Sequence, residues 1–289
     1  MLRPRGVGPV LRDGLSDGWQ SSRSVTRRGQ WAGATEREDH VLRRLRDYEN
    51  FEVWSLEGRE LGRVEDFYFD EDKWTVRYIV VTTGTWLTGR SVLASPLSVD
   101  RLRWNDGRVD VRLTEAQIKA APSADLAQPV SQQWEAEYSM YYGIPNYWTG
   151  PGIWGMGMTP TEALSAVEGT PPSTPMPRDT RHLRSIKEVA GYHIHARDGE
   201  IGHVDDFLTD DRSWTIRYLM IDTSNWIGGR TVLIPPEWAH RIDWADKQVY
   251  VDVTREAVKE SPEYDPAADI DGKYEQRLAD AYRRPVKPL

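Results

Sequence analysis

Residues 62–69 (GRVEDFYF) and 74–81 (WTVRYIVV) decide the fold of this 289-residue chain, because both stretches occur twice. They recur 140 residues later as GHVDDFLT and WTIRYLMI. Between residues 62–122 and 202–262, 24 of the 61 positions are identical without a gap. Repeats of solenoid proteins are only about 20–50 residues long, so this longer period indicates a duplicated domain.

Each copy alternates apolar and polar residues with the period of two that is typical of β-strands. In the first copy we expect strands at residues 51–55, 61–69, 74–81, 91–94, 99–104 and 109–113, joined as a meander. Gly62 marks a bulge, and Asp106-Gly107 is a hairpin turn. Thr114 and Gln117 form the capping box of a short helix, and Thr254 begins the equivalent helix. Six short strands expose fewer edges when they close, so each copy should be a small, compact β-barrel.

Composition excludes several classes of protein. The chain has no Cys, which rules out disulfide scaffolds, Cys-ligated zinc and iron–sulfur clusters. Its longest near-apolar run, residues 78–81, is far too short to span a bilayer as a helix. The net charge is −8 and both copies hold more acidic than basic residues, which disfavours nucleic-acid binding. We therefore expect a soluble, cytoplasmic protein with a protein partner or with itself as partner.

The chain outside the repeats has its own composition. We divide the sequence into an Arg-rich disordered arm at residues 1–44, a first domain at 45–122, a linker at 123–182, a second domain at 183–262 and a tail at 263–289. An organelle transit peptide is the alternative interpretation of the arm. Residues 170–177 (TPPSTPMP) form a Pro-rich spacer, and residues 274–282 predict a short surface helix.

The linker is unusually aromatic. Seven aromatic residues fall within 21 positions, interleaved with Gly and Pro: Trp134, Tyr138, Tyr141, Tyr142, Tyr147, Trp148 and Trp154. Aromatic side chains bury large areas and carry much of the energy of interfaces. This segment should therefore pack, either on the chain's own domains or on a partner or second copy.

A search for catalytic and cofactor motifs yields no strong candidate. The sequence has no Gly-x-Gly-x-x-Gly after a strand, no Walker-type Gly-Lys-Ser/Thr and no His-Glu-x-x-His. His193, His195 and His203 are weak candidates for a metal site, but the first copy has Glu52, Trp54 and Arg63 at these positions. Surface histidines are the favoured interpretation, and we expect no enzymatic activity and no cofactor.

Charged residues that both copies retain are a second candidate set. From these we single out Asp66, Arg77 and Arg90 in the first copy and Asp206, Arg217 and Arg230 in the second, all in strand-rich sequence. A structural network of hydrogen bonds and ion pairs is the favoured interpretation, and recognition of a shared ligand is the alternative. The acidic stretch at residues 70–72 fits a hairpin loop, in which Asp side chains bind nearby main-chain groups.

These motifs, in this order, resemble the PRC-barrel family. The resemblance rests on residues 57–67, 74–81, 89–93 and 109–114, and on the equivalent residues of the second copy. It implies two small β-barrels in tandem within an all-β fold, each with a short C-terminal helix, joined by the aromatic and Pro-rich linker. Family members include the cytoplasmic part of the photosynthetic reaction-centre H subunit and a ribosome maturation factor, so the resemblance implies protein or ribonucleoprotein binding.

The leading functional hypothesis is a non-enzymatic protein-interaction or scaffolding module. A small-ligand or metal sensor is one alternative. A peripheral role linked to the reaction centre or to RNA processing is another, and it rests on analogy with the family alone.

Overall fold

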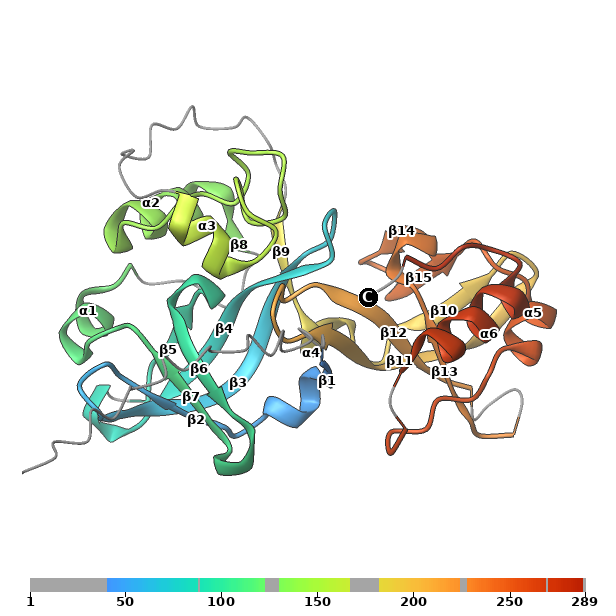
Figure 1. Ribbon diagram of the computed structural model, residues 1–289, viewed down its shortest axis with the longest axis horizontal. Coiled ribbons are helices and arrows are strands. Elements are labelled where there is room, and N and C mark those ends of the chain that lie inside the picture. The colour runs from blue at the N-terminus through green and yellow to red at the C-terminus, as the bar shows by residue number, and fades with distance from the viewer. Residues whose placement is uncertain are drawn as a thin grey trace, which may run out of the picture. The chain divides into compact units, whose positions relative to one another are not determined.

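Each repeat folds into its own β-sheet, and the two sheets have the same strand order (Figure 1). This computed structural model describes residues 41–87, 89–122, 130–166, 182–223, 228–268 and 270–287. Residues 1–40 of the predicted arm, the Pro-rich spacer at residues 170–177 and Trp226 lie outside these described residues.

The six strands predicted for each repeat are confirmed. The first sheet has the order β5-β4-β3-β2-β7-β6, with β2 (Glu52–Trp54), β3 (Glu60–Asp70), β4 (Thr75–Thr83), β5 (Ser91–Ala94), β6 (Val99–Arg103) and β7 (Arg108–Val111). The second has the order β13-β12-β11-β10-β15-β14, with β10 (His193–Ala196), β11 (Gly199–Asp210), β12 (Ile216–Asp222), β13 (Thr231–Ile234), β14 (Ala239–Asp243) and β15 (Gln248–Val251).

The remaining elements are helical or lie between the sheets. The short helix predicted after each sheet is present as α1 (Glu115–Ala120) and α5 (Arg255–Glu260). Thr114 and Gln117 form the predicted capping box of α1, and Thr254 caps α5. The 3₁₀ helices are η1 (Leu45–Tyr48), η2 (Thr85–Leu87), η3 (Pro96–Ser98), η4 (Trp104–Asp106) and η5 (Pro236–Trp238).

The sheets do not close into barrels by hydrogen bonds, contrary to the expectation of closure. β7 pairs in parallel with β2, so the strands do not form a simple meander. Among the described residues, no ladder joins β5 to β6 or β13 to β14. The edge of β13 is instead covered by the chain that follows α5, since the Tyr264 N–H donates to the Thr231 carbonyl (2.9 Å). An edge covered in this way needs no barrel closure.

A glycine at the start of each long strand allows two strands to approach closely. The pairing of β2 with β3 shifts by one residue beside Gly62, which is the predicted bulge. Gly62 has a φ of 154°, and a Cβ there would lie 2.2 Å from the Thr82 carbonyl oxygen. Gly202 has the same role, with 2.0 Å to the Asp222 carbonyl oxygen. No other residue type fits these two positions without moving the main chain.

Two short strands cross from one repeat to the other. β1 (Leu42–Arg44) precedes the first repeat but pairs with β11 of the second, with Arg44 opposite Leu208. β9 (His182–Ser185) precedes the second repeat but pairs with β3 of the first, with Ser185 opposite Tyr68. Residues 42–44 belong to the predicted arm and residue 182 to the predicted linker, yet both form strands. Strands this short carry no periodicity that could reveal them.

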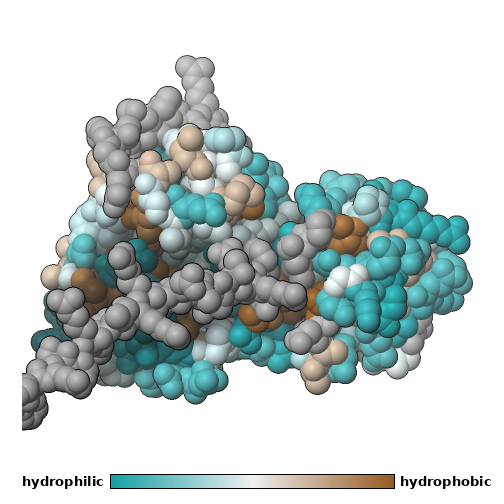
Figure 2. All heavy atoms as spheres, in the orientation of Figure 1, coloured by the Kyte–Doolittle hydropathy of each residue, from teal (hydrophilic) through white to brown (hydrophobic). Residues whose placement is uncertain are grey.

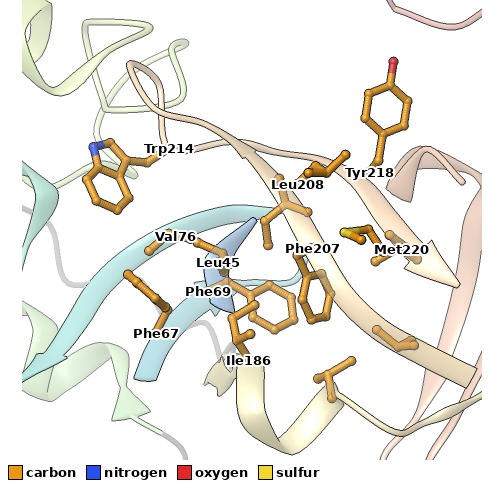
Figure 3. Close-up of a cluster of buried hydrophobic side chains, with 14 of the residues drawn as sticks. Leu45, Phe67, Phe69, Val76, Ile186, Phe207, Leu208, Trp214, Tyr218 and Met220 are labelled. Carbon is orange, nitrogen blue, oxygen red and sulfur yellow. The ribbon is translucent and has the colours of Figure 1, made fainter. Parts of the chain in front are cut away.

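The two repeats share one hydrophobic core. The Val76 N–H donates to the Trp214 carbonyl (2.9 Å), and the Ile216 N–H donates to the Trp74 carbonyl (2.7 Å). Figure 3 shows apolar side chains of both repeats in this region, together with Leu45 of η1 and Ile186 of α4 (Ile186–Val189). Phe69 and Phe207 lie 6.2 Å apart, centroid to centroid. The exchanged strands and this core make the pair of repeats one folded unit.

The structural repeat extends beyond the sequence match. Helix α2 (Gln132–Tyr142) in the predicted linker and α6 (Gly272–Tyr282) in the predicted tail have equal length and keep the offset of 140. Before α2, β8 (Val130–Ser131) pairs with β9; α3 (Pro160–Ala166) follows α2. Residues 130–166, the described part of the predicted linker, are therefore more than a connector, since they pack on the first repeat. None of the helices in the described part of the chain is long and apolar enough to cross a membrane.

Candidate interaction site

Asp66 and Asp206 hold the crossing segments in place. Asp66 on β3 accepts hydrogen bonds from the Ser185 hydroxyl (2.5 Å) and from the Lys187 N–H (3.2 Å) at the start of α4. Asp206 on β11 accepts one from the Arg46 N–H (3.3 Å) at the start of η1. Each carboxylate therefore binds the chain that enters the other repeat, which is a structural role.

Asp66 and Asp206 differ in one hydrogen-bond partner, the Ser185 hydroxyl, which donates to Asp66 and has no counterpart at Asp206 among the described residues. Arg44 stands where the other copy has Ser185, and it bonds to Asp47 (2.6 Å). Oδ2 of Asp206 is buried without a hydrogen-bond partner among the described residues. Burial raises the pKa of Asp206 to about 6. Burial also raises the pKa of Asp66, but the Ser185 hydroxyl opposes that rise.

Asp206→Asn is expected to stabilise the protein at neutral pH. A carboxyl whose pKa is raised in the folded state makes the protein less stable as the pH rises from the ordinary pKa of 3.8 through the folded-state pKa of about 6. The uncharged amide does not incur this loss, so the variant should gain about 2–3 kcal/mol over wild type at pH 7.5 and little at pH 4. Urea unfolding at both pH values measures the difference.

Asp66→Asn is the matched control for this prediction, because its carboxylate keeps the Ser185 hydrogen bond. Its gain at pH 7.5 should be smaller. An equal gain at both pH values, or a larger gain for Asp66→Asn, would contradict the assignment.

Arg77 lies at the centre of a buried polar cluster under the linker. Its side chain is 1% exposed and pairs with Asp70 (3.1 Å). Its guanidinium also donates to the Ile153 carbonyl (2.8 Å) and lies 3.7 Å from the ring centroid of Tyr147. Trp154 adds a second aromatic face at 4.8 Å. The linker thus completes the buried surroundings of the Arg77 guanidinium, which projects from β4 of the first sheet.

Glu135 on α2 belongs to the same cluster. It accepts a hydrogen bond from the Tyr147 hydroxyl (3.1 Å). Burial raises its pKa to about 8, although Arg77 opposes the rise. The Glu135 carboxyl is therefore harder to ionise than an ordinary glutamate, and the ion-pair partner of Arg77 is Asp70. In the second repeat the Tyr218 hydroxyl donates to Glu275 (3.0 Å), the residue 140 positions after Glu135.

The other repeated arginines bind main-chain carbonyls. Arg90 donates to the Ala121 carbonyl (3.1 Å) after α1, and Arg230 donates to the Val258 carbonyl (2.8 Å) in α5. Arg217 donates to the Lys287 carbonyl (2.6 Å) and is partly exposed, unlike Arg77. All six of these charged residues thus have a hydrogen-bond partner within the chain.

The seven linker aromatics lie mainly on the first repeat. Tyr138 and Trp154 are buried, and Trp134, Tyr142, Tyr147 and Trp148 are partly buried. Tyr138 packs edge to face on Tyr78 (5.0 Å) and accepts a hydrogen bond from the Ser95 N–H (3.0 Å). Tyr141 is 41% exposed. Packing within the chain thus accounts for most of this set.

The three histidines lie on the second sheet. His193 faces His203 across β10 and β11, and His195 stacks on Tyr250. His193 pairs with Glu200 (2.8 Å), and His203 lies 3.8 Å from Asp222. Within the described ranges, no three His, Cys, Asp or Glu side chains gather in a way that could hold a metal ion.

A groove lies where the two repeats meet. Its volume is about 820 Å³, and it is lined by residues 71–74 of the first repeat, by Ile153 and Met158 of the linker and by β12, β14 and η5 of the second repeat. Val286 and Lys287 of the tail complete it. On the face shown in Figure 2, hydrophilic residues cover most of the second repeat and hydrophobic residues form small, separate patches. Met158 is 53% exposed at the groove, and Met156 is 65% exposed nearby in sequence.

The sequence pattern of the PRC-barrel domain matches residues 40–118 and 184–258, just over half of the chain. The chain belongs to the PRC-barrel family. This confirms the resemblance and the tandem arrangement. A comparison with curated proteins gave no match.

The PRC-barrel matches contain the six repeated charged residues but not the linker that covers Arg77. Helices α2, α3 and α6 lie outside both matches. The groove is lined partly by the family domains and partly by the rest of the chain. Arg217 and Pro236 lie within a match, whereas Ile153, Met158 and Lys287 lie outside both matches. The features that distinguish this chain are thus added around two family domains.

Sequence reasoning missed the groove and Glu135. A signal for Glu135 was present, because the offset of 140 continues past residue 122 and pairs Glu135 with Glu275 and Tyr142 with Tyr282. The groove has no such signal. Its walls come from segments that are distant in sequence, and no local pattern joins them.

Proposed function

We propose that this PRC-barrel protein is a non-enzymatic interaction or scaffolding module of the cytoplasm, and that its partner binds the groove between the repeats. The observation that carries the proposal is the groove itself, whose walls belong to both repeats and to the linker. A surface formed in this way requires the duplication, since one repeat alone supplies only part of it.

The chemistry of the groove supports a polypeptide partner. Apolar groups such as Ile153 and Met158 alternate with charged ones such as Arg217, Glu237 and Arg241. Methionine side chains adapt to varied apolar surfaces and are common at protein-binding sites. Interfaces typically combine an apolar centre with a polar rim.

Met158→Glu tests the proposal. Tagged full-length protein is used to recover partners from its native cells, followed by quantitative mass spectrometry. A partner of the groove should be lost from the Met158→Glu protein, because the substitution places a charge on the groove wall. Met140→Glu is the control, since Met140 is 80% exposed on α2 and does not line the groove.

Equal recovery of every partner by wild type and both variants would contradict the proposal. Light scattering of the same proteins identifies self-association. A dimer that only Met158→Glu dissociates would make a second copy the partner.

A further inference from the structure

The loop at residues 150–158 (GPGIWGMGM) packs against Arg77 of the first repeat and Ser213 of the second. Trp154 at its tip is 1% exposed, and its indole N–H donates to the Ser213 carbonyl (2.7 Å). The loop is held in shape by hydrogen bonds from the Gly152 N–H to the Gly155 carbonyl (2.7 Å) and from the Trp154 N–H to the Gly157 carbonyl (2.9 Å). A Cβ on Gly152 would lie 2.3 Å from the Gly157 carbonyl oxygen, so the fold of the loop requires glycine.

Three elements of the chain hold this loop. Arg77 binds it through the Ile153 carbonyl and the Trp154 ring, and Ser213 accepts the indole hydrogen bond. Helix α3, which follows the loop, contacts η3 at residues 96–98. The loop therefore sits on the first repeat and on the hairpin of the second.

Each of these holding residues has a counterpart in the open groove. At the offset of 140, Arg77 corresponds to Arg217, Pro96 to Pro236 and Ser213 to Lys73. Arg217, Pro236 and Lys73 all line the 820 Å³ groove. The surface that the Trp154 loop covers on the first repeat thus corresponds, through the duplication, to walls of the open groove.

The groove between the repeats is open over the part of the chain that the structure describes. The exposed fractions differ accordingly: Arg77 is 1% exposed and Trp214 is 2% exposed, whereas their counterparts Arg217 and Trp74 are partly exposed.

We propose that the open groove binds a glycine-rich segment of a partner protein that inserts a tryptophan, as the Trp154 loop does in the first repeat. The Lys73 carbonyl would accept the indole hydrogen bond, and the Arg217 guanidinium would stack on the ring. An indole is the aromatic group that a guanidinium attracts most strongly. Lys73, Arg217, Arg241 and Lys287 outnumber Glu71, Asp72 and Glu237 along the walls, so acidic residues beside the tryptophan should add to binding. The groove is continuous with the interface between the repeats, because Trp74 belongs to both. The inference rests on the proposed function and names the partner's chemistry.

A peptide of this chain's own sequence tests the inference. The probe is the synthetic peptide of residues 149–159 (TGPGIWGMGMT) with a fluorescent label, titrated into the full-length protein and followed by anisotropy. One peptide should bind per protein, and the Trp154→Ala peptide should bind at least about tenfold more weakly. Arg217→Ala in the protein should weaken binding by about threefold to thirtyfold, which is the range of a cation–π contact at a partly buried site.

Arg63→Ala is the matched control protein, because Arg63 is exposed and does not line the groove. Its affinity for the peptide should equal that of wild type. No binding of the probe, equal binding of the Trp154→Ala peptide, or equal binding by the Arg217→Ala protein would each overturn the inference. If the protein forms a dimer that Arg217→Ala dissociates but the peptide does not, the groove binds a second copy of the chain. This result would also overturn the inference.

Failure here is distinguishable from failure of the proposed function. Suppose that recovery of a partner depends on Met158 but the peptide does not compete with that partner. The proposed interaction module would then be retained, and only the insertion of a tryptophan would be ruled out.

Discussion

Replacement of Arg77 by methionine is expected to lower the free energy of unfolding by about 3–5 kcal/mol. Arg77 is 1% exposed and Asp70 is 7% exposed in their ion pair. The variant would leave the buried Asp70 carboxylate without its opposite charge, although the Asp72 and Lys73 N–H groups would still donate to it. The hydrogen bond to the Ile153 carbonyl and the stacking on Tyr147 would be lost as well. Urea unfolding at pH 7, followed by tryptophan fluorescence, measures the change.

Arg217→Met in the second repeat is the control for this experiment. Arg217 is the counterpart of Arg77 in sequence, but it is partly exposed, whereas Arg77 is 1% exposed beneath the linker. Its replacement should cost about 1 kcal/mol or less. Equal losses in the two variants would show that the linker does not bury Arg77 in solution.

Trp154→Ala is expected to lower the free energy of unfolding by about 3–5 kcal/mol. The indole is 1% exposed, donates to the Ser213 carbonyl and covers Arg77. Its removal leaves a cavity and exposes the charged cluster beneath the loop. Thermal unfolding measures the loss of stability, and limited proteolysis of residues 144–166 should become faster because the loop loses its anchor.

Met156→Ala is the matched variant for Trp154, since Met156 lies in the same loop but is 65% exposed. Its cost should stay within about 0.5 kcal/mol. A Trp154→Ala protein as stable as the Met156→Ala protein would contradict the assignment of Trp154 as the anchor of the linker.

Much of each repeat could be predicted from local sequence. Alternation identified the strands, Thr114 with Gln117 identified a helix start, and Gly62 identified a bulge, because each of these signals acts between near neighbours in the chain. The strand order could not be predicted. β7 pairs in parallel with β2, more than 50 residues earlier, and nothing in either short strand specifies that partner.

The candidate site was predictable only in part. The aromatic content of residues 134–154 showed that the linker must pack, but the choice between its own repeat and a partner depended on Arg77 and Tyr78, which present a buried charge and an aromatic face to it. Glu135 gave a weak signal through its repeat partner Glu275. The open groove gave none, because Lys73 and Arg217 meet only when the two hairpins do.

Residue spacing and patterns repeated at a fixed offset were enough to predict the duplication, the strands of each repeat and the family. The exchange of β1 and β9 between the repeats, and the open groove where the repeats meet, appear only in the three-dimensional structure. The exchanged strands are three or four residues long, and their partners in the other repeat lie more than 100 residues away along the chain. Such contacts exist only after both repeats have folded against each other.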